Sequence, residues 1–315
     1  MSRRFFSCST EEGVLRFSIL ITLFVAVLGV VFGLLAGSLT LLFDAAYELI
    51  DVAMTGLALL VARLIAASTS GAMAGKRLAE RFNMGFWHLE PMVLGFNGLL
   101  LMGAAAYGLL HSIDSLFNGG RPLSFDYALL FAVVSLAVEC AAAMFVRAAN
   151  RRIKSEFLAL DAKSWLMSAW ITVAYLLAFG FGMAAQGSRL EWLTPYIDPI
   201  ALALVCLAVL PIPLGTVRRA LADILLVTPA ELKQHVDEVA QASVRRYGFA
   251  SYRANVARVG RGRQIELYFL VSSEWPAKAL AEWDRIRDEI SDAIGGDTPD
   301  RWLMIVFTTD PEWAE

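Results

Sequence analysis

Residues 14–36 read VLRFSILITLFVAVLGVVFGLLA, and residues 39–68 read LTLLFDAAYELIDVAMTGLALLVARLIAAS. Both stretches exceed the roughly 20 apolar residues that a helix needs to cross the hydrocarbon core of a bilayer. Only Gly37 and Ser38 lie between them, which leaves room for a tight turn and nothing more. The pair therefore predicts a hairpin of two membrane helices.

The composition of the whole chain agrees with a membrane protein. Of its 315 residues, 57% are hydrophobic and only 18% are charged, and the mean hydropathy is +0.58. Soluble domains carry about 25% charged residues, so the deficit indicates contact with lipid. Four further stretches are long and apolar enough to span a membrane: 92–113, 126–147, 164–185 and 197–216. We therefore predict an α-helical transmembrane domain of six helices over residues 1–216.

Residues 217–315 have the pattern of a soluble domain. ELKQHVDEVAQASVRRYG (231–248) and WPAKALAEWDRIRDEISDAI (275–294) are amphipathic helices. Two alternating strands flank a turn at Gly260–Gly262, and RWLMIVFTT (301–309) is a third strand. The order α-β-β-α-β predicts a small α+β domain of ferredoxin-like type, with both helices on one face of the sheet.

Basic residues cluster in the segments between spans two and three and between spans four and five, whereas the 3–4 and 5–6 loops carry one arginine each. The clustered residues are Lys76, Arg77, Arg81, Arg147, Arg151, Arg152 and Lys154. Such clusters stay on the cytoplasmic side of a membrane. We therefore expect both termini in the cytoplasm, and we place the protein in the bacterial inner (plasma) membrane.

Several other classes of protein are excluded by what the sequence lacks. A net charge of −3 gives no sign of nucleic-acid binding. Cys8, Cys140 and Cys206 are too few and too far apart for a disulfide framework or a cysteine zinc site. No nucleophile–base pair, Gly-rich phosphate loop or His-based metal motif is present, so we expect no enzyme and no resident cofactor.

Ionisable residues inside membrane helices indicate function. In the second span Asp44, Tyr47, Glu48 and Asp51 fall at positions 0, 3, 4 and 7, which places them on one helical stripe. In the fifth span Asp161, Ser164 and Ser168 repeat the spacing 0, 3 and 7. Facing each other, the two stripes would supply the oxygen ligands that a hard cation requires.

Purely structural roles remain open for some of these residues. Asp161 could cap its helix, and the serines could bond to their own helix backbone. Glu139 in the fourth span could belong to an ion pathway or to a hydrogen bond between helices, and His88 and Glu90 could anchor or gate the third span.

Several motifs resemble the cation diffusion facilitator family. GSLTLLFDAAYELIDV (37–52) is similar to the signature of that family's second helix, and GFWHLEPMVLGFNGLLL (85–101) to the start of its third. LALDAKSWLMSAW (158–170) corresponds to the fifth helix, and YIDPIALAL (196–204) to the sixth. The resemblance implies a homodimer of six-helix protomers that exports a divalent metal in exchange for protons, with a cytoplasmic domain of the predicted type.

The resemblance also implies a cation site of four side chains, which fall here on Tyr47, Asp51, Ser164 and Ser168. Only Asp51 keeps a strong metal ligand, because the other three are a phenol and two hydroxyls, which are weak partners for zinc.

An oxygen-only site suits Mn, Fe(II), Mg or another hard cation better than zinc. The auxiliary ligands or proton carriers would be Asp44, Glu48 and Asp161. We therefore expect a cation exporter that works by proton-coupled alternating access. The alternative is a transport-incompetent member that acts as a dimer partner or regulator through its cytoplasmic domain. The expected partners are membrane lipid, the transported cation, protons and a second copy of the chain.

Overall fold

The computed structural model describes residues 11–69, 85–153, 156–298 and 300–314. It divides into two compact units, residues 1–56 with 97–215 and residues 57–96 with 216–315, which are described separately. Some residues named above lie outside the described ranges: Cys8, Lys76, Arg77, Arg81 and Lys154. The domain boundary between residues 216 and 217 stays a prediction.

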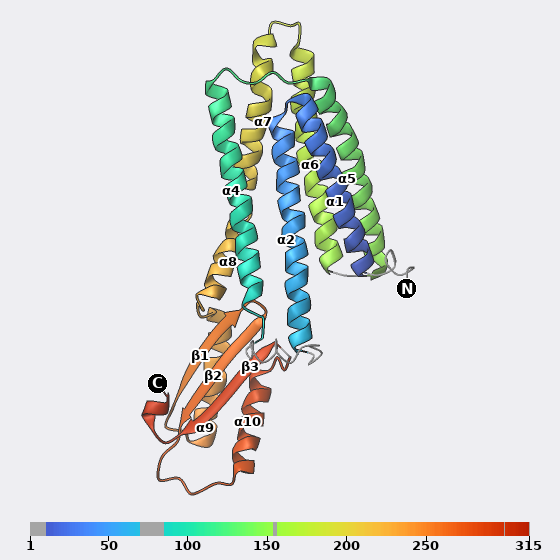
Figure 1. The fold of residues 1–315 in the computed structure, drawn as a ribbon. Coiled ribbons are helices and arrows are strands. Elements are labelled where there is room, and N and C mark those ends of the chain that lie inside the picture. The colour runs from blue at the N-terminus through green and yellow to red at the C-terminus, as the bar shows by residue number, and fades with distance from the viewer. Residues whose placement is uncertain (1–10, 70–84, 154–155, 299, 315) are drawn as a thin grey trace. The chain divides into compact units, whose positions relative to one another are not determined.

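Six long helices make up the apolar part of the chain and alternate in direction in the first unit (Figure 1). They are α1 (Glu11–Ala36), α2 (Leu39–Thr69), α4 (Leu89–Phe117), α5 (Phe125–Ile153), α6 (Glu156–Ala185) and α7 (Thr194–Val209). Among the described residues, five helical stretches are long and apolar enough to cross a membrane: Gly13–Ala36, Leu89–Phe117, Phe125–Ile153, Asp161–Ala185 and Glu191–Ile224. This confirms a predominantly helical membrane protein.

Helix α2 is continuous from Leu39 to Thr69 but is not among those five. It carries Asp44, Glu48, Asp51 and Arg63, and it ends beside residues that lie outside the described ranges. Five spans are found among the described residues, and the sixth stays a prediction.

The predicted hairpin of the first two helices is present. Gly37 has φ +71°, a left-handed conformation that glycine adopts without strain and that reverses the chain between α1 and α2. A Cβ added at Gly29 of α1 would lie 2.9 Å from the Cβ of Ala45 in α2. Such close approach through small residues is typical of helix packing in membranes.

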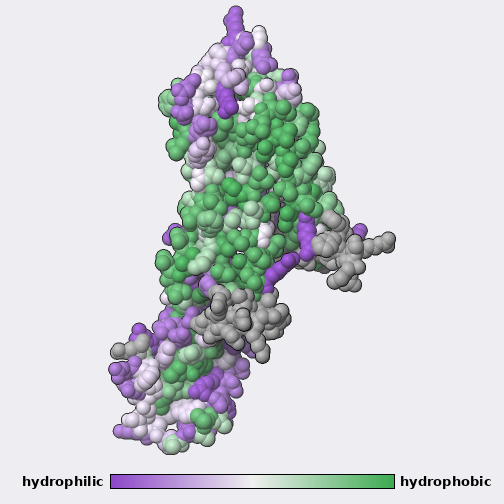
Figure 2. Space-filling model, in the orientation of Figure 1, coloured by the Kyte–Doolittle hydropathy of each residue, from purple (hydrophilic) through white to green (hydrophobic). Residues whose placement is uncertain are grey.

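Large apolar side chains cover the outer surfaces of these helices. Phe24, Leu34, Trp170 and Leu177 are each more than half exposed, and Figure 2 shows the hydrophobic colour spread widely over the helical part of the molecule. A soluble protein rarely exposes apolar surface on this scale, so lipid is the environment that fits it.

The last predicted span differs from the observed helix. We expected one helix over 197–216, but α7 ends at Val209, a turn follows, and α8 begins at Leu214 and ends at Ile224. The turn contains Pro211 and Pro213. Each proline lacks the N–H that would continue the helix, which accounts for the break. A short 3-10 helix, Glu191–Leu193, precedes α7.

The C-terminal part of the second unit has the predicted element order. It comprises α9 (Ala230–Tyr247), β1 (Ser251–Val259), β2 (Gly262–Leu270), α10 (Leu280–Ile294), β3 (Arg301–Thr308) and a 3-10 helix, Pro311–Ala314. The sheet order is β1-β2-β3, with β2 antiparallel to β1 and parallel to β3. This confirms a small C-terminal sheet domain, and its assignment as ferredoxin-like stays a prediction.

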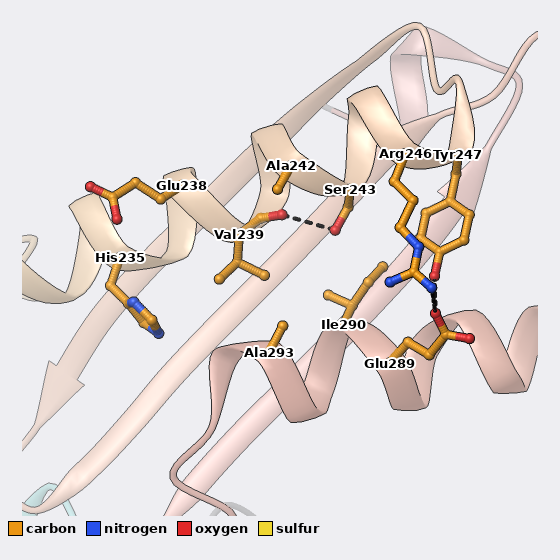
Figure 3. Close-up of a pocket in the computed structure, with 10 residues that line it drawn as sticks. All are labelled: His235, Glu238, Val239, Ala242, Ser243, Arg246, Tyr247, Glu289, Ile290 and Ala293. Atoms are coloured by element: carbon orange, nitrogen blue, oxygen red, sulfur yellow. Dashed lines mark hydrogen bonds and ion pairs between the residues drawn. The ribbon is translucent and has the colours of Figure 1, made fainter.

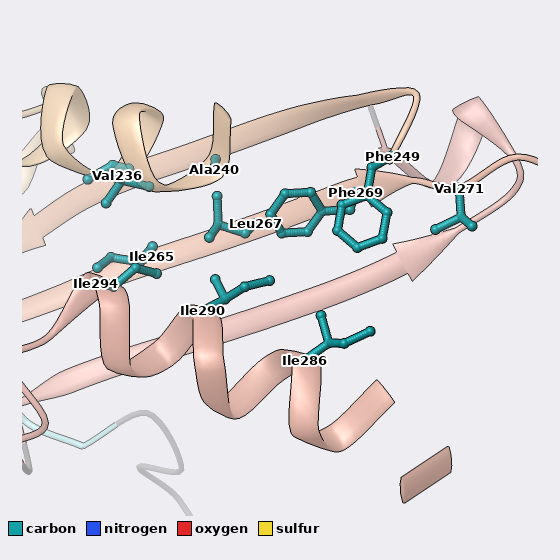
Figure 4. Packing of buried hydrophobic residues seen from close by; sticks show 11 residues of the cluster. Val236, Ala240, Phe249, Ile265, Leu267, Phe269, Val271, Ile286, Ile290 and Ile294 are labelled. Carbon is teal, nitrogen blue, oxygen red and sulfur yellow. The ribbon is translucent and has the colours of Figure 1, made fainter. Parts of the chain in front are cut away.

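One face of that sheet holds the core. Ile265, Leu267 and Phe269 alternate along β2 and pack with Val236 of α9 and Ile290 of α10 (Figure 4). Since residues two apart in a strand point to the same face, both helices cover one side of the sheet, as the sequence predicted.

Candidate functional site

Asp44 joins α2 to α6. Its Oδ1 accepts a hydrogen bond from the hydroxyl of Tyr175, with 3.2 Å between the oxygens. Tyr175 is 1% exposed and stacks against Phe179 of the same helix, with ring centroids 6.2 Å apart. At Asp44, α2 therefore faces α6 inside the first unit.

This contact fixes the relative depth of the predicted stripes. Helices α2 and α6 run in opposite directions (Figure 1). A step of seven residues moves about 10 Å along a helix and returns to nearly the same face. One such step from the Asp44–Tyr175 contact, toward the end of α2 and the start of α6, reaches Asp51 and Ser168. These two predicted site residues therefore lie at the same depth.

The other predicted site residues differ in their surroundings. Tyr47 is half-buried and packs against Phe43, with ring centroids 5.8 Å apart. Ser164 and Asp51 are exposed on their helices, and the Asn97 side chain of α4 lies within hydrogen-bonding reach of Asp51. A carboxylate exposed on a membrane helix requires water, protein or a cation as a partner.

Ser168 makes its recorded hydrogen bond to α5. Its Oγ donates to Glu139 Oε1 at 3.2 Å. The same oxygen accepts from Thr172 Oγ1 at 3.0 Å and from Ser135 Oγ at 2.9 Å. Glu139 is 1% exposed, and its other oxygen, Oε2, is buried without a hydrogen-bond partner. Glu139 therefore does form hydrogen bonds between helices, which was one of its two predicted roles. Its other predicted role, in an ion pathway, stays a prediction.

Asp161 lies inside α6, which already begins at Glu156, so it does not cap that helix. Its Oδ1 accepts a hydrogen bond from Ser18 Oγ of α1 at 3.0 Å, and Ser18 Oγ accepts one from Trp165 Nε1 at 2.7 Å. The second oxygen, Oδ2, is buried and without a partner. Asp161 thus faces α1, whereas Ser168, two turns further along, bonds to α5.

Asp198 is a buried carboxylate that the sequence showed only as part of a motif. It is 1% exposed on α7 and binds the start of α2. Its carboxylate accepts from the Ser38 hydroxyl, from Leu39 N at 2.8 Å and from Thr40 N at 3.3 Å. These groups include backbone N–H groups that the first turn of a helix leaves unpaired, so Asp198 stabilises α2 rather than a ligand.

Within the described ranges, no group of three or more His, Cys, Asp or Glu side chains lies close enough together to hold a metal ion. A cation site in the helical unit would therefore combine one or two carboxylates with hydroxyls and carbonyls. Such ligands suit hard cations rather than zinc.

In the second unit, Glu90 at the start of α4 binds the turn between β1 and β2. Arg261 Nε and Nη2 donate to Glu90 Oε2 and Oε1 at 2.9 and 3.2 Å, and Arg261 N donates to Oε2 at 3.2 Å. These hydrogen bonds raise the pKa of Arg261 above its usual value. A Cβ added at Gly262 would lie 2.7 Å from the Trp87 ring, so the turn fits closely against this segment.

A hollow of about 290 Å³ lies between α9 and α10 (Figure 3). Its polar groups already have partners. Glu289 accepts a hydrogen bond from the Tyr247 hydroxyl and pairs with Arg246 at 2.7 Å, and His235 Nε2 lies 3.0 Å from the carbonyl oxygen of Ile294. Burial, and secondarily Glu289, raise the pKa of Tyr247. This arrangement is typical of packing between helices.

Comparison with known proteins identifies the family. A search of curated proteins found no significant match. A family model described as the cation efflux transmembrane domain matches residues 15–225, which is about two thirds of the chain. The match includes α2, α5 and α6 and confirms the resemblance seen in the motifs. The protein therefore belongs to the cation diffusion facilitator family.

Proposed function

We propose that this protein exports a hard cation such as Mn, Fe(II) or Mg from the cytoplasm in exchange for protons, by alternating access. The observation that carries the proposal is the pairing of α2 with α6 through Asp44 and Tyr175. In support, Asp51 and Ser168 each lie seven residues from this contact on antiparallel helices, in a chain that belongs to the cation diffusion facilitator family.

Each residue has a distinct part in this proposal. Asp51 supplies the charged ligand, and Ser164, Ser168 and Tyr47 supply neutral oxygens. Asp44, Glu48 and Asp161 act as auxiliary ligands or carry protons in the opposite direction. Carboxylate and neutral oxygen ligands suit hard cations such as Mg²⁺ and Mn²⁺, whereas zinc sites are typically built from cysteine, histidine and carboxylate ligands. This difference favours a substrate other than zinc.

The proposal further includes six spans with α2 as the second, both termini in the cytoplasm, and a homodimer in the bacterial inner membrane. In support, α2 is a continuous helix of 31 residues that carries three carboxylates, Asp44, Glu48 and Asp51. A helix with such residues faces protein or water rather than lipid.

The test is cation-driven proton flux in proteoliposomes that enclose a pH-sensitive dye. We expect Mn²⁺ or Mg²⁺ gradients to drive proton movement with the wild-type protein. Asp51→Asn should reduce the flux to the level of empty liposomes, because one charged ligand is lost. Asp126→Asn is the matched control, since Asp126 is an exposed carboxylate in the first turn of α5.

The outcomes separate transport from a regulatory role. No flux with Mn²⁺, Fe²⁺, Mg²⁺ or Zn²⁺ would contradict the proposal. If Asp51→Ala also left the cellular phenotype unchanged while deletion of residues 229–315 abolished it, the protein would be a partner or regulator instead.

A further inference from the structure

Three hydroxyls and one buried carboxylate meet between α5 and α6. The hydroxyls of Ser135, Ser168 and Thr172 all donate to one oxygen of Glu139. Ser168 and Thr172 are one turn apart on α6, and Ser135 is one turn before Glu139 on α5, so both helices contribute oxygens to one small volume. Four oxygen-bearing side chains are therefore assembled in one small volume, and three of them, Ser135, Glu139 and Thr172, are at most 3% exposed.

The unpaired oxygen of Glu139 is the decisive feature. Oε2 is buried and has no hydrogen-bond partner, although the side chain is 1% exposed. A buried carboxylate oxygen without a partner is costly, and native proteins retain such a group where an ion or a function accounts for it. A cation bound against Oε2 would remove that cost.

The spacing of the oxygens suits a shared hard cation. Oxygens that coordinate one cation octahedrally at about 2.1 to 2.5 Å lie about 3 to 3.5 Å from one another. Ser168 Oγ and Thr172 Oγ1 lie 3.2 and 3.0 Å from Oε1, the other oxygen of the Glu139 carboxylate, so a cation held by both carboxylate oxygens would have these hydroxyls beside it. Serine and threonine in a helix can donate instead to a carbonyl of the preceding turn, which would free their oxygens to face a cation.

The charges around this point favour a divalent cation. The carboxylates of Asp44 and Glu48 on α2 both interact electrostatically with Glu139. Glu139 and Glu48 together carry two negative charges when ionised, and one divalent cation would balance both.

We propose that Glu139 is a cation ligand of this protein, together with Ser168 and Thr172 and with Glu48 facing them from α2. The inference rests on the proposed function and extends it. Ser168 of α6 has only a hydroxyl, but it contacts the carboxylate of Glu139 on α5. In this proposal Glu139 adds a charged oxygen to the site between α2 and α6, so that all its ligands are oxygens, as a hard divalent cation prefers.

The test measures binding separately from transport. Mn²⁺ bound by the purified, detergent-solubilised protein is measured from the loss of the free Mn²⁺ electron paramagnetic resonance signal. We expect Glu139→Gln to weaken Mn²⁺ binding by at least about tenfold. Glu139→Asp keeps the charge on a shorter side chain and should bind more tightly than Glu139→Gln. Glu191→Gln, at an exposed position before α7, should bind like the wild type.

The fold and the two proposals are checked in the same samples. Glu139→Gln keeps an acceptor oxygen for the three hydroxyls, so its melting temperature should stay near that of the wild type. Binding of Mn²⁺ by Glu139→Gln at the wild-type affinity would overturn the inference, as would a wild-type protein that binds no Mn²⁺. Binding that depends on Glu139 without any proton flux would support the inference and reject the proposed function instead.

Discussion

Carboxylates in the two units of the molecule have different kinds of partner. In the second unit several carboxylates pair with cations: Glu90 with Arg261, Glu289 with Arg246, and Asp237 with Lys233. In the first unit, the carboxylates of Asp44 and Glu139 have neutral hydrogen-bond partners. Asp44 bonds to a phenol and Glu139 to three hydroxyls.

This difference has a physical meaning. A charge away from water needs compensation, and a built-in arginine or lysine would supply it permanently. Hydroxyls stabilise a carboxylate only in part, so in the proposed function a cation that enters and leaves would supply the remaining compensation. By contrast, the three carboxylates named in the second unit have built-in cationic partners. Four substitutions test the contrast, in order of expected effect on stability.

The first separates a structural carboxylate from the functional ones. Asp198→Ala should lower the free energy of unfolding by about 4 kcal/mol, because it leaves several buried donors at the start of α2 unpaired. Thermal unfolding in detergent measures the effect. Asp51→Asn is the control and should leave the melting temperature nearly unchanged. Equal stability of Asp198→Ala and wild type would show that Asp198 is not structural.

The second concerns the apolar core of the sheet domain. Leu267 is fully buried between the sheet and its two helices. Leu267→Ala should destabilise that domain by about 3 kcal/mol through the cavity it creates. Hydrogen exchange in β2 of the full-length protein should speed up, while exchange in α5 and α6 stays unchanged. Faster exchange in all of these elements would mean that the two units unfold together.

The sequence predicted much of the fold. Long apolar runs identified the membrane helices, and alternation identified the strands, because both patterns are local. Gly37 and Ser38 likewise placed the first turn correctly. The end of α7 was missed, although Pro211 and Pro213 were visible, because the apolar run continues through them.

The partners of polar side chains could not be predicted in the same way. Asp198 caps a helix that begins 159 residues earlier in the chain, and Glu139 meets Ser168 across two helices. Such contacts depend on helix rotation, which the apolar pattern of a membrane helix specifies weakly. Spacing did place Asp51 and Ser168 on stripes, but only the Asp44–Tyr175 contact set their relative depth.

The third substitution tests the close fit of the β1–β2 turn. Gly262→Ala should cost about 2 kcal/mol, because the new methyl group overlaps the Trp87 ring. Trp87 belongs to the packed cluster around Val61, Ile65 and Phe86, so it has little room to move. Hydrogen exchange near residues 86–91 should increase. Gly215→Ala is the control, since nothing lies within 4 Å of its added methyl group. Unchanged exchange in Gly262→Ala would contradict the fit.

The smallest effect is expected for the ion pair itself. Arg261→Gln should cost about 1 kcal/mol, because the pair is partly exposed and water screens it. The loss should shrink further in high salt. Arg253→Gln changes an exposed arginine of β1 and serves as the control. If Arg261→Gln destabilised the protein as much as Leu267→Ala, the Glu90–Arg261 ion pair would contribute far more to stability than its partial exposure predicts, and the expectation would be wrong.

The most direct test of the central claim is an anomalous-difference map from crystals of the protein soaked in Mn²⁺. We predict a peak between α2 and α6, within bonding distance of Asp51 or Glu139 and at the depth of Ser168. The peak should disappear in Asp51→Asn crystals soaked in the same way. A wild-type map without a peak between these helices, or with Mn²⁺ bound only in the C-terminal domain, would contradict the claim that this protein holds its cation there.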